Sequence, residues 1–314
     1  MRPLLYLLAT GFTVGLTTNL TKVAIQQAVN PLAFLAWPVL AASLLLGALA
    51  SLGRRGDRER ERDDARKRKP VSTAAIVEYS FVAGLLTIAA PQLMLFAAVP
   101  HVGAAFVVLS LAFPPLYTYL GALLLRMERF DTARAAGVLL ALGGAAILAV
   151  FKLSEPRESA VWVALTLFAP VLLAAGNLYR TLRWPKNASP ASLAPLMLGG
   201  AAVILIAFGL VSTTVPAVNA SLTLAIPAEP GLGIAGLFVA QAFTFAAAYR
   251  LFFLLQRAGG PVYLSLLGSV AAITGVPIAV LLLGESLPRG LFAAGTLIVL
   301  GVGLLTARHA PRSR

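Results

Sequence analysis

The chain has 314 residues, of which 59% are hydrophobic and only 12% are charged, and its formal net charge is +13. A mean hydropathy of +0.87 excludes an ordinary soluble globular protein and indicates a protein built into a membrane. The chain contains no cysteine, which excludes disulfides, thiolate metal ligands and thiol nucleophiles.

Apolar stretches of about 20 residues recur along the chain, which is the length that a helix needs to cross roughly 30 Å of hydrocarbon. We therefore expect an all-α integral membrane protein with ten transmembrane helices. The first stretch is too long for a signal-peptide core and has a counterpart in the second half, so we expect it to be retained. The ten stretches are 4–26, 31–52, 73–97, 103–125, 132–151, 160–182, 191–212, 232–256, 261–283 and 289–307.

Basic residues gather in alternate loops, beginning with segment 54–69, which is almost entirely charged. Loops on the opposite side hold only Lys152, Arg157 and Arg289. This bias is the positive-inside pattern and predicts that both termini lie in the cytoplasm. Because the charges lie in short loops on alternate sides of the predicted spans, we expect no nucleic-acid partner. The later basic loops and the C-terminal tail contain Arg126, Arg129, Arg134, Arg183, Lys186, Arg257, Arg308, Arg312 and Arg314.

The second half of the chain repeats the first. Residues 96–148 reappear in register at 253–305, so that Gly103 corresponds to Gly260 and Glu128 to Glu285. The segment Asn19-Leu20-Thr21-Lys22 is echoed by Asn177-Leu178-Tyr179-Arg180.

Each copy contains five predicted helices, and five is an odd number, so the two copies cross the membrane in opposite directions. This is the inverted repeat that many secondary transporters use, with the substrate path between the halves. We expect a first five-helix repeat at 1–151, with the charged cytoplasmic loop 54–69, and a second at 159–308. Together they form one transport domain.

Several segments resemble EamA-type transporters of the drug/metabolite transporter superfamily. Leu281-Leu282-Leu283-Gly284-Glu285-Ser286-Leu287 is similar to the LLLGE-x-L signature that ends the fourth helix of each half in that family. The first copy, Leu123-Leu124-Leu125-Arg126-Met127-Glu128, keeps the glutamate and lacks the glycine. Tyr249-Arg250-Leu251-Phe252, before Ala258-Gly259-Gly260, and Asn19-Leu20-Thr21-Lys22 are also similar to the family. The resemblance implies a central cavity lined by helices one, three, four, six, eight and nine, without nucleotide hydrolysis.

Polar side chains inside the predicted spans are costly in hydrocarbon and should face the protein interior or water. Proline and glycine breaks can free backbone carbonyls for a substrate in the same region. The candidate substrate path consists of Asn19, Lys22, Gln92, Tyr117, Asn177, Arg180, Gln241 and Tyr249. The candidate helix breaks near the site are Pro114, Pro115, Gly275 and Pro277.

Each candidate also has a purely structural interpretation. Lys22, Arg180 and Arg250 can extend their charges to the membrane interface. Asn19 and Gln241 can bridge helices by hydrogen bonds, and Tyr249 can anchor a helix at the interface. Glu128 and Glu285 end one helix and precede the next, where a carboxylate fits the dipole of a helix N-terminus.

The inverted repeat places the two basic residues on opposite sides of the membrane. We expect Asn19 and Lys22 to line the external half of the path, and Asn177 and Arg180 the internal half.

The expected function is export of a small metabolite across the inner membrane of a bacterial cell by alternating access. The intramembrane cations Lys22, Arg180 and Arg250 favour cargo with a carboxylate, such as an amino acid. One alternative is efflux of hydrophobic or cationic drugs, for which Glu78 is the only acidic candidate. An alternative of another class is a lipid-handling or scaffold protein that transports nothing.

We expect no enzyme activity, cofactor or metal. His101 and His309 are the only histidines, and no phosphate-binding loop or nucleophile motif is present. The expected partners are the small-molecule substrate, membrane lipid and a second copy of the chain. A homodimer would form through helices five and ten, whose glycines permit close helix contact. These glycines are Gly143, Gly144, Gly295, Gly301 and Gly303.

Overall fold

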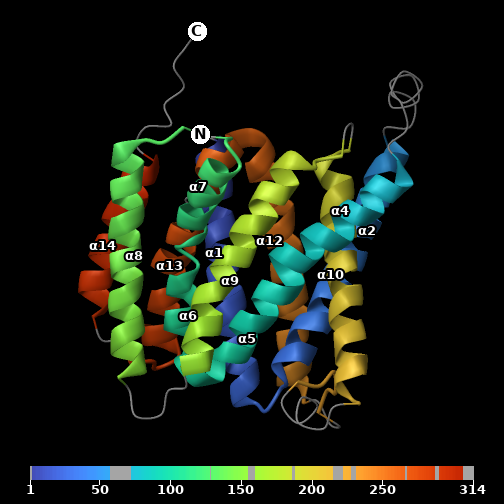
Figure 1. Ribbon diagram of the computed structural model, residues 1–314. Helices are drawn as coiled ribbons and strands as arrows, with labels where there is room; N and C mark the ends of the chain where they lie inside the picture. Colours follow the sequence, from blue (N-terminus) through green and yellow to red (C-terminus); the bar gives the residue numbers. More distant parts are fainter. Residues whose placement is uncertain are drawn as a thin grey trace.

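The computed structural model describes residues 2–56, 72–127, 129–154, 160–185, 188–214, 222–227, 231–265, 267–286 and 290–306. These residues form helices joined by short connections, and they contain no strand (Figure 1). Nearly all of the charged loop 54–69 lies outside the described residues, and so does Glu128.

In the first half of the chain, two of the helical rods depart from a regular α-helix in their middle. A π-helical segment, η1, joins α4 to α5 without ending the rod, whereas a turn at Leu111–Phe113 separates α6 from α7. The elements are α1 (Arg2–Gln26), α2 (Pro31–Gly56), α4 (Thr73–Gly84), η1 (Leu85–Ala89), α5 (Ala90–Val102), α6 (Ala104–Ser110), α7 (Pro114–Leu124) and α8 (Thr132–Leu153).

The second half begins with α9 and contains another π-helical segment, η2, at the end of α13. Its elements are α9 (Ala160–Leu182), α10 (Pro190–Ser212), α12 (Leu232–Ser265), α13 (Leu267–Pro277), η2 (Ile278–Leu282) and α14 (Leu291–Thr306). The apolar stretches predict a helix boundary at residues 257–260, but this prediction is wrong, because α12 continues through these residues to Ser265.

Eight of the described helical segments are long and apolar enough to cross a membrane. Two shorter apolar helices, Leu267–Leu282 and Leu291–Gly301, occupy the positions of the last two predicted spans. The all-α integral membrane architecture is thus confirmed, while the count of ten crossing helices stays a prediction.

Helix packing interleaves the two halves of the chain. In the second half, α12 and α13 pack on α1, and in the first half, α5 and α7 pack on α9. Two further pairs, α2 with α10 and α8 with α14, join corresponding helices directly. The contacts are therefore symmetric: α1 contacts the second half in the same way as its counterpart α9 contacts the first half. The proposed boundaries 1–151 and 159–308 stay a prediction.

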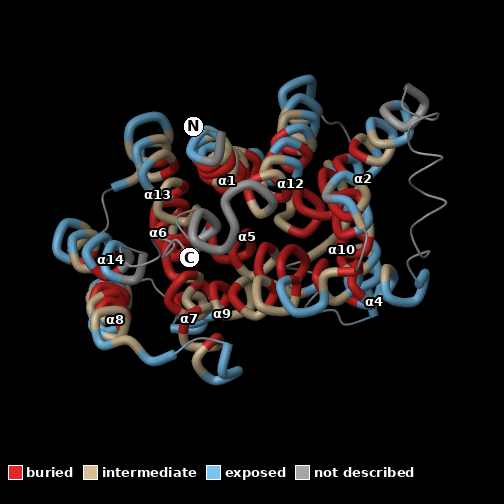
Figure 2. Tube along the Cα trace, turned by 90° about the horizontal axis from the view of Figure 1, so that it is seen from above, coloured by how far each residue is buried: buried red, intermediate tan, exposed pale blue. Residues whose placement is uncertain are grey.

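Two faces of the bundle serve as references for the site. The start of α1 and the end of α14 lie on one face, the terminal face, and the end of α1 and the start of α6 lie on the opposite, far face (Figure 1). Viewed along the helices, buried residues face the middle of the bundle and exposed residues face outward (Figure 2). Large apolar side chains such as Leu44, Leu139 and Phe292 are exposed, as expected of helices that contact lipid.

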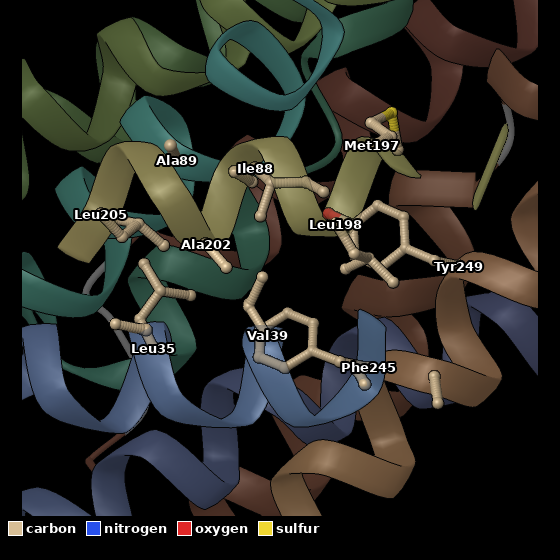
Figure 3. Close-up of a cluster of buried hydrophobic side chains, with 14 of the residues drawn as sticks. Leu35, Val39, Ile88, Ala89, Met197, Leu198, Ala202, Leu205, Phe245 and Tyr249 are labelled. Carbon is tan, nitrogen blue, oxygen red and sulfur yellow. The ribbon is translucent and has the colours of Figure 1, made fainter. Parts of the chain in front are cut away.

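The main hydrophobic core lies where α2, α10 and α12 meet η1 (Figure 3). Val39 from α2 and Ile88 from η1 pack with side chains of α10 such as Leu198. Phe245 and Tyr249 of α12 belong to the same core. Because both of these aromatic residues also line the cavity described below, the core fixes one wall of that cavity.

Candidate functional site

The helix formed by α6 and α7 is interrupted in its middle by Pro114 and Pro115. Proline has no N–H, so Pro115 cannot donate the helical hydrogen bond that the carbonyl of Leu111 would accept in a continuous helix. Gly268, near the start of α13, lies against this carbonyl so closely that no Cβ fits between them. The break in one half therefore meets the start of α13 in the other half.

A cavity lies beside this break, with a volume of about 90 Å³ open to the centres of water-sized molecules. A site of this size holds several waters or a small polar solute. Its walls come from α1, the α4–η1–α5 rod, the α6–α7 break, α9, α12 and α13, which are the six helices that the family resemblance implies. Its lining residues are Val14, Thr17, Thr87, Gln92, Leu111, Pro114, Pro115, Leu173, Asn177, Phe245, Ala248, Tyr249, Phe252, Leu267 and Gly268.

The cavity reaches from the middle of the bundle toward the terminal face. Thr17, Gln92 and Phe245 lie near the middle of their helices, whereas Asn177 lies near the terminal-face end of α9 and Leu267 is the first residue of α13. Gln92 forms a side-chain hydrogen bond with Tyr249 across the cavity wall. This hydrogen bond therefore links a polar side chain of the first half to one of the second half at the cavity wall.

Arg180 of α9 adjoins the cavity and is completely buried. Its Nη2 donates a hydrogen bond of 2.7 Å to Asn177 Oδ1, and its guanidinium carbon lies 4.3 Å from the ring centroid of Phe252. Its Nη1 atom is buried and has no hydrogen-bond partner among the described residues. Since Asn177 and Phe252 line the cavity, one residue layer separates this cation from the cavity space.

Lys22 lies at the opposite end of the molecule, near the far-face end of α1. Its Nζ is 2.7 Å from Glu285 Oε1, and both side chains are largely buried. The carboxylate of Glu285 also accepts hydrogen bonds from the N–H groups of Ala104 (2.7 Å) and Ala105 (2.8 Å). Lys22 therefore makes an internal ion pair rather than extending to the membrane interface.

From its place in the sequence, Glu285 is expected at the N-terminus of the helix that follows it in the chain. The structure corrects the identity of that helix, because the carboxylate meets the start of α6 in the first half. A carboxylate still lies at a helix N-terminus, where the helix dipole favours it.

Two predicted path residues bridge helices in this structure. Asn19 Nδ2 donates to the carbonyls of Gly15 (2.8 Å) and Gly275 (3.0 Å), and Gln241 Nε2 donates to the carbonyl of Thr17 (3.3 Å). Of the predicted site residues, Gln92, Asn177, Tyr249, Pro114 and Pro115 line the cavity. The structure does not bring Asn19, Tyr117, Gln241, Gly275 or Pro277 to its lining.

Sequence reasoning missed Thr17, Thr87 and Phe252 of the cavity lining. The two threonines lie in apolar spans, where a threonine hydroxyl usually bonds its own helix backbone, so they gave no distinct signal. Phe252 appeared only as part of a family-like segment. Its position over the Arg180 guanidinium depends on the packing of α9 against α12.

The remaining charged candidates lie at the surface. Arg250 is exposed at the edge of a crevice that contains Leu46 and Leu254, in agreement with a side chain that extends to the interface. Glu78 is exposed and accepts a hydrogen bond of 3.3 Å from the hydroxyl of Tyr179.

Comparisons with known proteins agree with this architecture. Residues 1–150 match the model of the EamA-like transporter family. A comparison with curated protein sequences gave no match. One solved structure, described only as a crystal structure of a protein, covers 96% of this chain and 99% of its own, at 17% identity and a TM-score of 0.57. At this identity the likeness shows the fold alone.

Proposed function

We propose that this chain, whose residues 1–150 match the EamA-like transporter family, is a secondary transporter of a small metabolite that carries a carboxylate. The observation that carries the proposal is Arg180, a completely buried cation with a partnerless Nη1 atom beside the cavity. A buried charge is costly unless an opposite charge compensates it. No described carboxylate of the chain pairs with Arg180, so a carboxylate of the substrate supplies the compensation.

The backbone break favours an amino acid among the carboxylates. The carbonyl of Leu111 lies at the cavity and lacks its helical donor because residue 115 is proline. A carbonyl oxygen accepts hydrogen bonds from an ammonium group. A zwitterion in the cavity would therefore lie beside this acceptor, with the Arg180 cation one residue layer behind Asn177 and Phe252.

The proposed mechanism is alternating access, with export from the cytoplasm of a bacterial cell across its inner membrane. The basic loops favour a cytoplasmic terminal face. The cavity reaches from the middle of the bundle toward that face, whereas Lys22 and Glu285 join α1 to the second half near the far face. In this arrangement cargo enters from the cytoplasm and leaves when the far face opens.

The test is binding and transport by the purified full chain. We expect an amino acid or organic acid to raise its melting temperature in detergent and to be transported by proteoliposomes. Arg180→Gln should weaken binding by roughly tenfold or more, because hydrogen bonds to charged groups are among the stronger ones. Arg180→Lys should restore part of it, since lysine keeps the charge and loses the planar geometry.

Arg250→Gln is the matched control, because it removes a cation from α12 that is exposed rather than buried. Equal loss of binding in both variants would contradict the proposed role of Arg180. The alternative function, efflux of hydrophobic or cationic drugs, predicts stabilisation by cations instead. The cavity lining argues against it, since the described lining residues include no acidic side chain.

A lipid-handling or scaffold protein would show neither stabilisation by solutes nor transport. We also propose lipid and a second copy as partners at α8 and α14. Gly144 and Gly301 already pack between these two helices within the chain, against Ala294 and Gly137. A homodimer there would use the exposed outer surfaces of both helices, including Leu139 and Val299.

A further inference from the structure

The contact around Glu285 joins three segments of the chain near the far face. Lys22 comes from α1, Glu285 follows η2, and Ala104 and Ala105 begin α6. Two segments belong to the first half of the chain and one to the second. Any movement that separates the halves at the far face must break this contact.

The contact is strong and still accessible. One carboxylate receives an ammonium and two backbone N–H groups, each within 2.8 Å, and charge-assisted bonds of this kind are the stronger hydrogen bonds. A cavity of about 130 Å³ borders it, lined in part by Gly103, Lys152, Glu285 and Ser286. Water in this cavity can solvate the carboxylate when the contact opens.

The sequence repeat predicts a weaker corresponding contact in the other half. Under the repeat, Glu285 corresponds to Glu128, Ala104 to Pro261 and Ala105 to Val262. Proline has no N–H, so a contact of this kind at residue 261 would lack one of the two backbone donors. Glu128 lies outside the described residues, and Pro261 and Val262 lie within α12 rather than at the start of a helix.

We infer that Glu285 is a latch that holds the far face closed, and that the extra N–H of Ala104 biases the chain toward this state. The inference rests on the alternating access proposed above. In the cycle, Glu285 leaves Lys22 and the start of α6, the far face opens, and the latch re-forms after cargo is released. The alanine-to-proline difference between the repeats sets the balance between the two states.

The test uses the natural absence of cysteine in the chain. Ala248 lines the cavity, so an Ala248→Cys reporter measures access to it. A membrane-impermeant thiol reagent is added to intact cells or to inside-out vesicles, which expose opposite faces. When Ala248→Cys is the only substitution, we expect the reagent to label the cysteine faster from the terminal face than from the far face.

Glu285→Ala and Ala104→Pro should each raise the rate of labelling from the far face, by roughly tenfold for Glu285→Ala and less for Ala104→Pro. Ala104→Pro changes no charge, and proline is well tolerated at the first position of a helix. Gly103, which precedes it, has a ψ of 154°, as residues before proline prefer. Glu78→Gln is the control for loss of a carboxylate, because Glu78 is exposed on α4 and should change nothing.

A paired charge exchange separates a latch from a simple ion pair. Lys22→Glu combined with Glu285→Lys keeps opposite charges together but cannot accept bonds from the N–H groups of α6. We therefore expect the double variant to label from the far face like Glu285→Ala. Native labelling in the double variant, or unchanged far-face labelling in both Glu285→Ala and Ala104→Pro, would overturn the latch. The labelling assay uses no substrate. Its result therefore tests the latch even if the proposed substrate is wrong.

Discussion

The side-chain amide of Asn19 donates a hydrogen bond of 3.0 Å to the backbone carbonyl of Gly275, and this bond joins α1 of the first half to α13 of the second. The helices approach closely at this point, because a Cβ on Gly15 would lie 2.8 Å from the carbonyl oxygen of Ala271. A small-residue contact with a polar bridge is a common way for membrane helices to associate. The bond therefore helps to hold the two halves together between the cavity and the latch.

Replacing Asn19 by leucine should destabilise the protein without removing the cavity. We expect a loss of about 0.6 kcal/mol, the average measured for hydrogen bonds between membrane helices, and at most about 1.7 kcal/mol, visible as a lower melting temperature in detergent. Substrate affinity should change little, because Asn19 is not part of the cavity lining. Unchanged stability with strongly weakened binding would instead place Asn19 in the substrate path.

Gly268→Ala should abolish substrate binding. Its new Cβ would collide with the carbonyl of Leu111, so either the α6–α7 break or the start of α13 must move. Gly236→Ala is the matched control, since a Cβ there meets nothing within 4 Å. The control should fold at least as well as the native chain, because alanine favours a helix by up to about 1 kcal/mol over glycine. Binding assays on both variants check this, and normal binding by Gly268→Ala would show that the contact is not required.

Gly103→Ala should open the latch. Gly103 has a φ of +83°, which favours glycine, and a Cβ there would lie 3.3 Å from Glu285 Oε2. We expect faster labelling of the Ala248→Cys reporter from the far face. Gly284 also has a positive φ, of +63°, but has open space around it. Gly284→Asn should therefore label like the native chain, and equal effects of both substitutions would indicate backbone strain alone.

Single cysteines at two serines should report the sidedness of the bundle. Ser154 is exposed beyond the far-face end of α8, and Ser189 is exposed before α10 at the terminal face. If the terminal face is cytoplasmic, Ser154→Cys reacts with an impermeant reagent on intact cells and Ser189→Cys does not. The opposite pattern would reverse the proposed direction of transport.

Local patterns in the sequence predicted most of the architecture. Apolar length alone located the helices, because a span needs nearly the same length wherever it occurs. The prolines at 114 and 115 predicted the break that borders the cavity, since proline removes backbone donors locally. The odd number of predicted helices in each copy also placed Lys22 and Arg180 at opposite ends of the bundle, because the two copies then run in opposite directions.

Contacts between distant segments were not predictable in this way. Glu285 bonds to a residue 181 positions away, at Ala104, and no spacing rule relates them. The end of one apolar stretch at 256 and the start of the next at 261 predicted a helix boundary between them, yet α12 continues through these residues. Asn19 was expected in the path because it is polar and intramembrane, and its bond to Gly275 depends on how closely α1 and α13 approach.

The π-helical segment η1 sets the direction in which the residues of α5 face. A π-helical turn holds an additional residue compared with a regular helix. If the same residues formed a regular helix instead, α5 would rotate by roughly 100° relative to α4. That rotation would carry Gln92 away from Tyr249 even though every cavity residue were kept. The shape of the cavity therefore depends on the backbone of a segment that contributes only Thr87 to the lining.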